Sequence, residues 1–185
     1  MVFVKARTII LSVVFILILG LGIMTTNQYL KANELKNTML SCQNSLSIAL
    51  TNRNTQMNTL TELVQEQQVP LSDRGSIDVL QTAQASIEYY QSKPNESSPH
   101  DVYQSNQAVS NSFDALLAAI PEDSSILNDT GYQTAVKEIR NLNNLIEESF
   151  KTYNRAAFDY NHEIDNFPIL LFNLFTGYSQ VSYYA

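Results

Sequence analysis

The sequence predicts an all-α protein in which an N-terminal transmembrane helix is followed by an antiparallel bundle of about four long helices. Three observations support this fold class. A charge-free apolar run lies close to the N-terminus. Long polar stretches rich in Asn, Gln, Ser, Thr and Leu follow it, with few alternating β-branched residues. The last long stretch places apolar residues at alternating steps of four and three, as in a helix that packs along one face.

The apolar run extends from Thr8 to Leu30 without a charged residue. A helix needs about 20 apolar residues to cross ~30 Å of hydrocarbon, and it satisfies its backbone hydrogen bonds internally. A cleaved signal peptide is the competing interpretation, but the residues after Met24 offer no good small-x-small cleavage site. We therefore expect an uncleaved anchor over residues 8–28 that places the chain in the lipid bilayer.

The flanking charges predict the orientation of this anchor. Lys5 and Arg7 precede the run, and positive flanks stay in the cytoplasm. Lys31 and Lys36 lie just beyond the span and oppose this orientation. We expect a single-pass protein of the cytoplasmic membrane with residues 1–7 inside and the bundle extracytoplasmic.

The charge and cysteine content exclude several function classes. Residues 27–185 carry nine basic and 18 acidic side chains, a formal net charge of −9. Nucleic acids require basic patches, so no nucleic-acid partner is expected. Cys42 is the single cysteine, which rules out an internal disulfide. We expect it to be a small buried apolar residue on a helix.

The last long helix is predicted from Thr130 to Pro168. Asp129 or Thr130 can cap its start, and Pro168 ends it. Leu142 and Leu145 widen its apolar seam to a face suited to a bundle. The seam positions are Tyr132, Val136, Ile139, Asn143, Ile146, Phe150, Tyr153, Ala157, Tyr160, Ile164 and Phe167.

Two Tyr-Asn pairs lie seven residues apart within this helix. The spacing puts Tyr153 and Tyr160 on one face, two turns apart, with Asn154 and Asn161 at the edge of the seam. We expect the rings to be buried, with the hydroxyls and side-chain amides reaching polar partners on a neighbouring helix.

Three more helices complete the predicted bundle over residues 29–168. The first continues the membrane helix outward, because nothing breaks the chain between Leu30 and Val69; its seam is weak near Gln56 and Met57. Two shorter helices follow at residues 76–92 and 102–120, joined by a polar loop closed by prolines at 93–99.

The C-terminal tail, residues 169–185, is apolar and aromatic and carries no charge. Two interpretations stay open for it. It packs as a strap on the bundle, or its rings lie in the membrane interface near the anchor. The outcome depends on the end of the bundle from which the tail leaves.

A pattern of nine residues extends over the C-terminal part of the chain: Tyr153, Asn154, Tyr160, Asn161, Ile164, Phe167, Pro168, Gly177 and Tyr178. In this pattern the C-terminal third of the chain resembles the LemA family. The first long helix departs from the family pattern, since "TQMNTLTELV" at 55–64 lacks the usual Pro and Asp, and a charged tail is missing. The resemblance implies a membrane-anchored bundle of long helices and no defined biochemical activity.

Enzymatic chemistry is not expected. A di-iron bundle requires two Glu-x-x-His motifs, whereas the chain has only His100 and His162, neither in that setting. There is no glycine-rich phosphate loop and no nucleophile elbow. We expect no metal, no cofactor and no catalytic residue.

Arg53 and Asn143 fall on seams that should be apolar, so each must find a hydrogen-bond partner. One hypothesis is that these buried polar residues fix the alignment of the helices. It predicts that Asn143→Leu does not destabilise the bundle. The other hypothesis is a small polar pocket between helices.

Two functions remain. The first is a scaffolding or protein-interaction module at the outer face of the membrane that holds a membrane or envelope protein. The second is an extracytoplasmic bundle that senses a small ligand and signals through a membrane partner; converging polar groups around a pocket would favour it. The long seam serves a bundle or a coiled-coil dimer, so a homo-oligomer also stays open.

Overall fold

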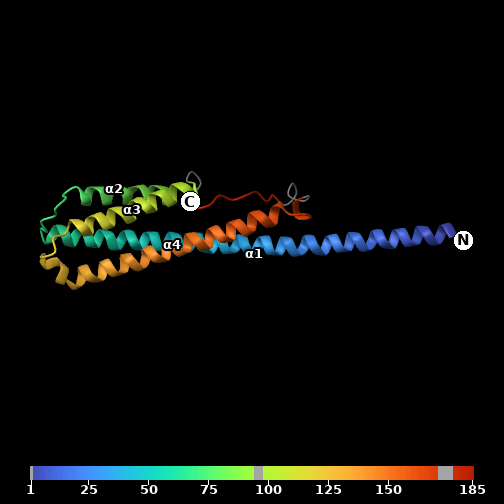
Figure 1. Ribbon diagram of the computed structural model, residues 1–185, viewed down its shortest axis with the longest axis horizontal. Helices are drawn as coiled ribbons and strands as arrows, with labels where there is room; N and C mark the ends of the chain where they lie inside the picture. The colour runs from blue at the N-terminus through green and yellow to red at the C-terminus, as the bar shows by residue number, and fades with distance from the viewer. Residues whose placement is uncertain (1, 94–97, 171–176) are drawn as a thin grey trace. The chain divides into compact units, whose positions relative to one another are not determined.

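One helix carries both the apolar run and the first bundle segment. The computed structural model describes residues 2–93, 98–170 and 177–185 (Figure 1). Helix α1 extends without a break over Val2–Glu66. Its side chains from Ile10 to Met24 are exposed, and one 18-residue window has a mean hydropathy of 2.2. Within the described residues, α1 is the one helix long and apolar enough to cross a membrane, and it continues directly into the bundle as expected.

Two shorter helices, α2 (Ser76–Ser92) and α3 (Pro99–Ala119), pack as a hairpin (Figure 1). The bounds of α2 are those predicted. Helix α3 begins three residues before the predicted Val102, because Ser98 and Asp101 form a capping box. The Asp101 amide donates to the Ser98 hydroxyl at 3.2 Å, and the Ser98 amide donates to the Asp101 carboxylate at 3.1 Å.

The last helix, α4, spans Thr130–Asp165 and follows a short 3₁₀ turn, η1 (Ser125–Asn128). Asp129 caps it, since the Tyr132 amide donates to the Asp129 carboxylate at 2.9 Å. The helix ends two residues before Phe167. This early end explains why Phe167 is 57% exposed, although the seam predicted it to be buried.

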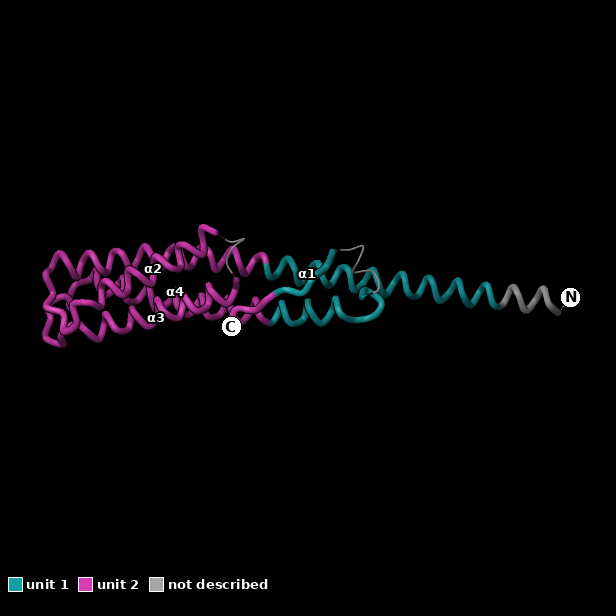
Figure 2. The backbone as a smooth tube through the Cα atoms, turned by 90° about the horizontal axis from the view of Figure 1, so that it is seen from above, with its two compact units in different colours: residues 1–39, 155–181 teal, residues 40–154, 182–185 magenta. Residues whose placement is uncertain are grey.

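Helices α1 and α4 each contribute to two compact units of the chain (Figure 2). Unit 1 contains residues 1–39 and 155–181, and unit 2 contains residues 40–154 and 182–185.

Unit 2 is an antiparallel four-helix arrangement whose register is fixed by side-chain contacts. In each helix pair, the residue number on one helix rises as the number on its partner falls, which defines antiparallel neighbours. Arg53–Asn143 joins α1 to α4, and Gln67–Asp129 joins the residue after α1 to the residue before α4. The other contacts are Ser47–Gln91 and Asn58–Gln84 between α1 and α2, and Tyr103–Phe150 and Asn106–Glu147 between α3 and α4.

The core of unit 2 largely follows the predicted seams, although Val136 on α4 is only half-buried and three other positions differ from expectation. Met57 is fully buried, so the seam of α1 is continuous where the sequence suggested a weak patch. Leu145 is 49% exposed and does not widen the apolar face of α4. Cys42 is half-buried rather than buried, and this partial burial raises the pKa of its thiol.

Unit 1 joins α1 to the C-terminal end of α4. Ala32, Tyr160, Ile164 and Ile169 are buried between them. The Lys31 ammonium donates to the Glu163 carboxylate at 2.7 Å, and this contact raises the pKa of Lys31. Because Lys31 is largely exposed, solvent screens most of the attraction.

Candidate functional site: amide clamps on the C-terminal segment

In unit 2, the side-chain amide of Asn154 holds one residue of the C-terminal segment, defined here as residues 177–185. Its nitrogen donates to the Tyr184 carbonyl at 2.7 Å. Its oxygen accepts from the Tyr184 amide at 2.8 Å. One side chain therefore satisfies both backbone polar groups of Tyr184, as a neighbouring β-strand would.

In unit 1, Asn161 makes the same pair of hydrogen bonds with Val181. The Asn161 side-chain nitrogen donates to the Val181 carbonyl at 2.9 Å, and the Val181 amide donates to the Asn161 side-chain oxygen at 2.9 Å. We call these two arrangements the amide clamps. Each asparagine binds the backbone of the C-terminal segment through both atoms of its amide, whereas the sequence suggested polar partners on a neighbouring helix.

The two clamps follow opposite directions along the chain. Asn154 binds Tyr184, whereas Asn161, seven residues later, binds Val181, three residues earlier than Tyr184. Each Tyr-Asn pair therefore has its own partner residue in the C-terminal segment.

The tyrosine of each pair packs against a ring of the same segment. Tyr153 lies edge-on to Tyr184 with ring centroids 4.7 Å apart, and Phe150 contacts the same ring at 4.9 Å. Tyr160 lies edge-on to Tyr178 at 6.0 Å. The rings of Tyr153 and Tyr160 are buried, as predicted, and burial raises the pKa of both phenols.

Gly177 and Tyr178 begin the C-terminal segment. Gly177 has a φ of 67°, a backbone conformation that residues with a side chain rarely adopt. The Tyr178 hydroxyl is hydrogen-bonded to the Asn33 side-chain oxygen at 3.2 Å, and its ring lies 5.9 Å from that of Tyr29. These contacts within unit 1 support the strap interpretation for the described part of the tail, whereas residues 171–176 lie outside the described residues.

A third side-chain amide, that of Gln28, holds the turn after α4. The Gln28 nitrogen donates to the Phe167 carbonyl at 3.2 Å, and its oxygen accepts from the Ile169 amide at 3.2 Å. Pro168 between them is buried. Gln28 was not singled out from the sequence; the only available signal was an amide at the end of an apolar run.

Arg53 lies in the interior of unit 2 with no exposed surface. One nitrogen of its guanidinium donates to Asn106 at 2.7 Å and to Asn143 at 2.9 Å. Its other two nitrogens have no hydrogen-bond partner among the described residues. Burial lowers the pKa of Arg53 to about 10, against the opposing effect of the nearby Glu147 carboxylate.

Asn106 completes this polar group and was not predicted. Its side-chain nitrogen donates to the Glu147 carboxylate at 3.3 Å, so the carboxylate is linked to Arg53 through an amide. We call Arg53, Asn106, Asn143 and Glu147 the polar cluster. Arg53 and Asn143, for which the sequence predicted polar partners, are hydrogen-bonded to each other, although Asn143 is half-buried rather than buried.

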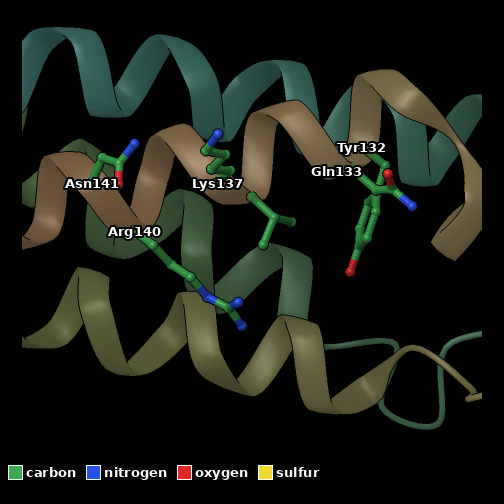
Figure 3. Close-up of a pocket in the computed structure, with 6 residues that line it drawn as sticks. Tyr132, Gln133, Lys137, Arg140 and Asn141 are labelled. Atoms are coloured by element: carbon green, nitrogen blue, oxygen red, sulfur yellow. The ribbon is translucent and has the colours of Figure 1, made fainter.

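A hollow of about 350 Å³ lies along α4. Tyr132 and Arg140 extend to one side of the helix, and Lys137 and Asn141 extend to the other (Figure 3). The two cations therefore do not converge on one point, and the hollow offers no paired anion site. In the part of the chain that is described, no three His, Cys, Asp or Glu side chains group as metal ligands.

The comparison with known proteins agrees with the architecture. The sequence pattern of the LemA family matches residues 43–185, well over half of the chain. The match includes the first bundle segment, which departs from the usual family residues, as well as both amide clamps. No curated protein matches the chain. On the extent of the family match, this chain belongs to the LemA family.

Proposed function

We propose that the protein is a single-pass membrane-anchored scaffold that holds a membrane or envelope protein at the outer face of the cytoplasmic membrane. One observation carries the proposal: helix α1 presents an exposed apolar band from Ile10 to Met24 and then supplies core residues of the bundle. Because the same helix forms the anchor and part of the bundle, a partner bound to the bundle is attached to the membrane. We propose no catalytic role for the bundle.

The contact residues of this scaffold must lie outside the amide clamps. Both asparagines are bound to the C-terminal segment, and the tyrosine rings are buried. In unit 2, the exposed apolar side chains include Ile48 on α1, Val79 on α2 and Leu145 on α4. We propose that a partner protein contacts one of these faces, because exposed apolar side chains are the usual centres of protein interfaces.

The test is site-specific photo-crosslinking in native membranes. A photoreactive residue is placed separately at Ile48, Val79 and Leu145 of the full chain, and the crosslinked proteins are identified by mass spectrometry. A scaffold gives one recurring membrane or envelope protein from one helix face. Replacing the exposed apolar residue of that face by glutamate, such as Val79→Glu on α2, should then abolish co-purification of that protein with the chain. Unspecific crosslinks from all three positions would contradict the proposal.

A second function is favoured by one hollow in unit 2. It measures about 560 Å³ and is lined by α1, α2, α3 and Tyr184. Polar side chains on its wall include Gln43, Asn44, Ser47 and Gln91. This lining supports the sensing alternative, in which a small polar molecule binds between the helices. A thermal-shift screen would test it, with Ser47→Phe to fill the hollow; a ligand that stabilises both chains equally would not bind there.

A further inference from the structure

The turn that follows α4 exposes two large apolar side chains in unit 1. Phe167 is 57% exposed and Leu170 is 50% exposed. The residues around them are buried: Ile164, Pro168 and Ile169 all face the interior. The turn is also held firmly, since the Leu170 amide donates to the Asn166 carbonyl at 3.0 Å and Gln28 binds the backbone on both sides of Pro168. The exposure of Phe167 and Leu170 is therefore a fixed feature of the turn.

The Gln28 contacts place this turn at one end of the apolar band of α1. Twenty residues of helix rise about 30 Å, the thickness of the hydrocarbon layer. Counted from Thr8, the first residue of the charge-free run, this length ends at Gln28. The turn therefore lies at the level where an α1 helix that spans the bilayer would leave the hydrocarbon.

The distribution of charge also places the turn at the edge of the hydrocarbon layer. No charged residue occurs between Asn166 and the end of the sequence. The charges nearest to the turn are Lys31 on α1 and, on α4, Asp165 and Glu163, which pairs with Lys31. All three precede the turn or follow the apolar run, so none lies within either stretch. Tyr29 is 45% exposed next to Gln28, and tyrosine is enriched at the boundary between lipid and water.

We propose that Phe167 and Leu170 insert into the interfacial layer of the phospholipid bilayer and form a second membrane contact beside the α1 anchor. The lipid surface is the occupant that these residues fit, because they continue the exposed apolar band of α1 and no charge interrupts them. The inference rests on the proposed anchoring by α1. Its consequence is that unit 1 is attached to the bilayer at two points, which restricts its rotation about the axis of α1.

The chain contains no tryptophan, so a single substitution creates a unique fluorescent reporter. The full chain is reconstituted into phosphatidylcholine vesicles with Phe167→Trp or Leu170→Trp. Fluorescence is then measured with lipids brominated at different depths of the acyl chain. We expect a loss of fluorescence with both variants, stronger for bromine close to the headgroup than for bromine near the bilayer centre.

Two controls separate this inference from the proposed anchor. Leu17→Trp reports on α1 and should be quenched best by deeply placed bromine. Phe158→Trp is the matched control on α4, because Phe158 is 63% exposed but lies seven residues before the end of the helix, about 10.5 Å further from the turn. It should not be quenched.

Each other outcome overturns the proposal in a recognisable way. Quenching with Leu17→Trp alone leaves the anchor and removes the second contact. No quenching with Leu17→Trp removes the anchor itself. A shift of the Phe167→Trp or Leu170→Trp emission to shorter wavelength without quenching by brominated lipid means that protein, such as a second copy of the chain, covers the turn instead.

Discussion

At the scale of the residue, Arg53 is a buried cation whose direct acceptors are two neutral amides. A buried charge costs free energy unless hydrogen bonds replace its water, and here two guanidinium nitrogens lack a partner among the described residues. The lowered pKa of Arg53 expresses the same cost. The remaining acceptors, Asn106 and Asn143, are therefore essential to the interior of unit 2.

The first prediction concerns Asn143→Leu. We expect it to lower the free energy of unfolding by about 1–3 kcal/mol, because the Arg53 guanidinium loses one of its acceptors. This expectation reverses the one that helix alignment alone suggested. Adding Arg53→Met should cost less than the sum of the two single changes, with a coupling energy of about 0.5–3 kcal/mol. Urea unfolding of the full chain in detergent measures each value.

Asn144→Leu serves as the control for this cycle, since Asn144 is an exposed neighbour on the same helix. It should change stability by no more than about 0.5 kcal/mol. Strictly additive effects of Arg53→Met and Asn143→Leu would mean that the two side chains do not stabilise each other.

The second prediction concerns stability in alkaline solution. Burial raises the pKa of the phenols of Tyr153 and Tyr184 above the ordinary value of 10.0. The folded chain then holds these protons more tightly than the unfolded chain does. The free energy of unfolding is therefore fully retained below about pH 10 and falls as the pH rises through the raised pKa values.

Arg53 acts in the opposite sense in the same pH range. Burial lowers its pKa to about 10, well below the ordinary value of a guanidinium, so its deprotonation in the folded chain adds stability above that pH. Tyr153→Phe should flatten the alkaline decline, and Arg53→Met should steepen it. Urea midpoints from about pH 8 to about pH 11 test both signs. An unchanged slope in Tyr153→Phe would contradict the assignment.

At the scale of the element, the C-terminal segment owes its position to side chains of α4 rather than to a β-sheet. Each amide clamp supplies two hydrogen bonds to one backbone residue. A typical intramolecular hydrogen bond contributes about 0.5–1.5 kcal/mol, so a clamp is worth about 1–3 kcal/mol locally. Loss of one clamp should free one part of the segment without unfolding the helix.

The third prediction is a reciprocal pattern of hydrogen exchange. Asn161→Leu should speed exchange of the Val181 amide by about ten-fold for each 1.4 kcal/mol lost, with little effect on Tyr184. Asn154→Leu should do the converse. Asn144→Leu on the outer surface of the same helix is the control and should change neither rate. Equal acceleration of both amides by either change would mean that the segment is released as a whole.

The sequence predicted the elements better than their contacts. The seven-residue step of Tyr-Asn correctly placed the rings of Tyr153 and Tyr160 on one buried face, because side chains seven residues apart project from the same side of a helix. It did not reveal that Val181 and Tyr184 bind the asparagines, since a backbone partner leaves no residue-type signal. Phe167 was misplaced because the seam was extended beyond the last helical residue, Asp165.

At the scale of the whole molecule, the continuity of α1 and the antiparallel arrangement followed from the absence of helix breaks and from the apolar seams. The start of α3 was missed although its signal was present: Ser98 and Asp101 have capping-box spacing, and Pro99 suits the first helical turn. The sequence predicted two of the four residues of the polar cluster. Arg53 and Asn143 interrupted seams, but only the register of four helices could show that Asn106 and Glu147 join them.

The fourth prediction concerns the side of the membrane on which unit 2 lies. Lys5 and Arg7 favour a cytoplasmic N-terminus, so the bundle should face outward. Replacing the single cysteine by Cys42→Ser and adding Ser86→Cys gives one exposed thiol on α2. A membrane-impermeant maleimide should label this thiol equally in intact and lysed cells.

Val4→Cys in the same Cys42→Ser chain is the matched control, because it keeps both N-terminal cations and should react only after lysis. The two thiols must respond oppositely if one helix separates them across the bilayer. Labelling of Ser86→Cys only after lysis, with Val4→Cys labelled in intact cells, would place the bundle in the cytoplasm. The anchor and the lipid contact of Phe167 and Leu170 would then stand, since neither depends on the side, whereas the extracytoplasmic scaffold would not. Equal labelling of both thiols in intact cells would instead contradict a helix that spans the membrane.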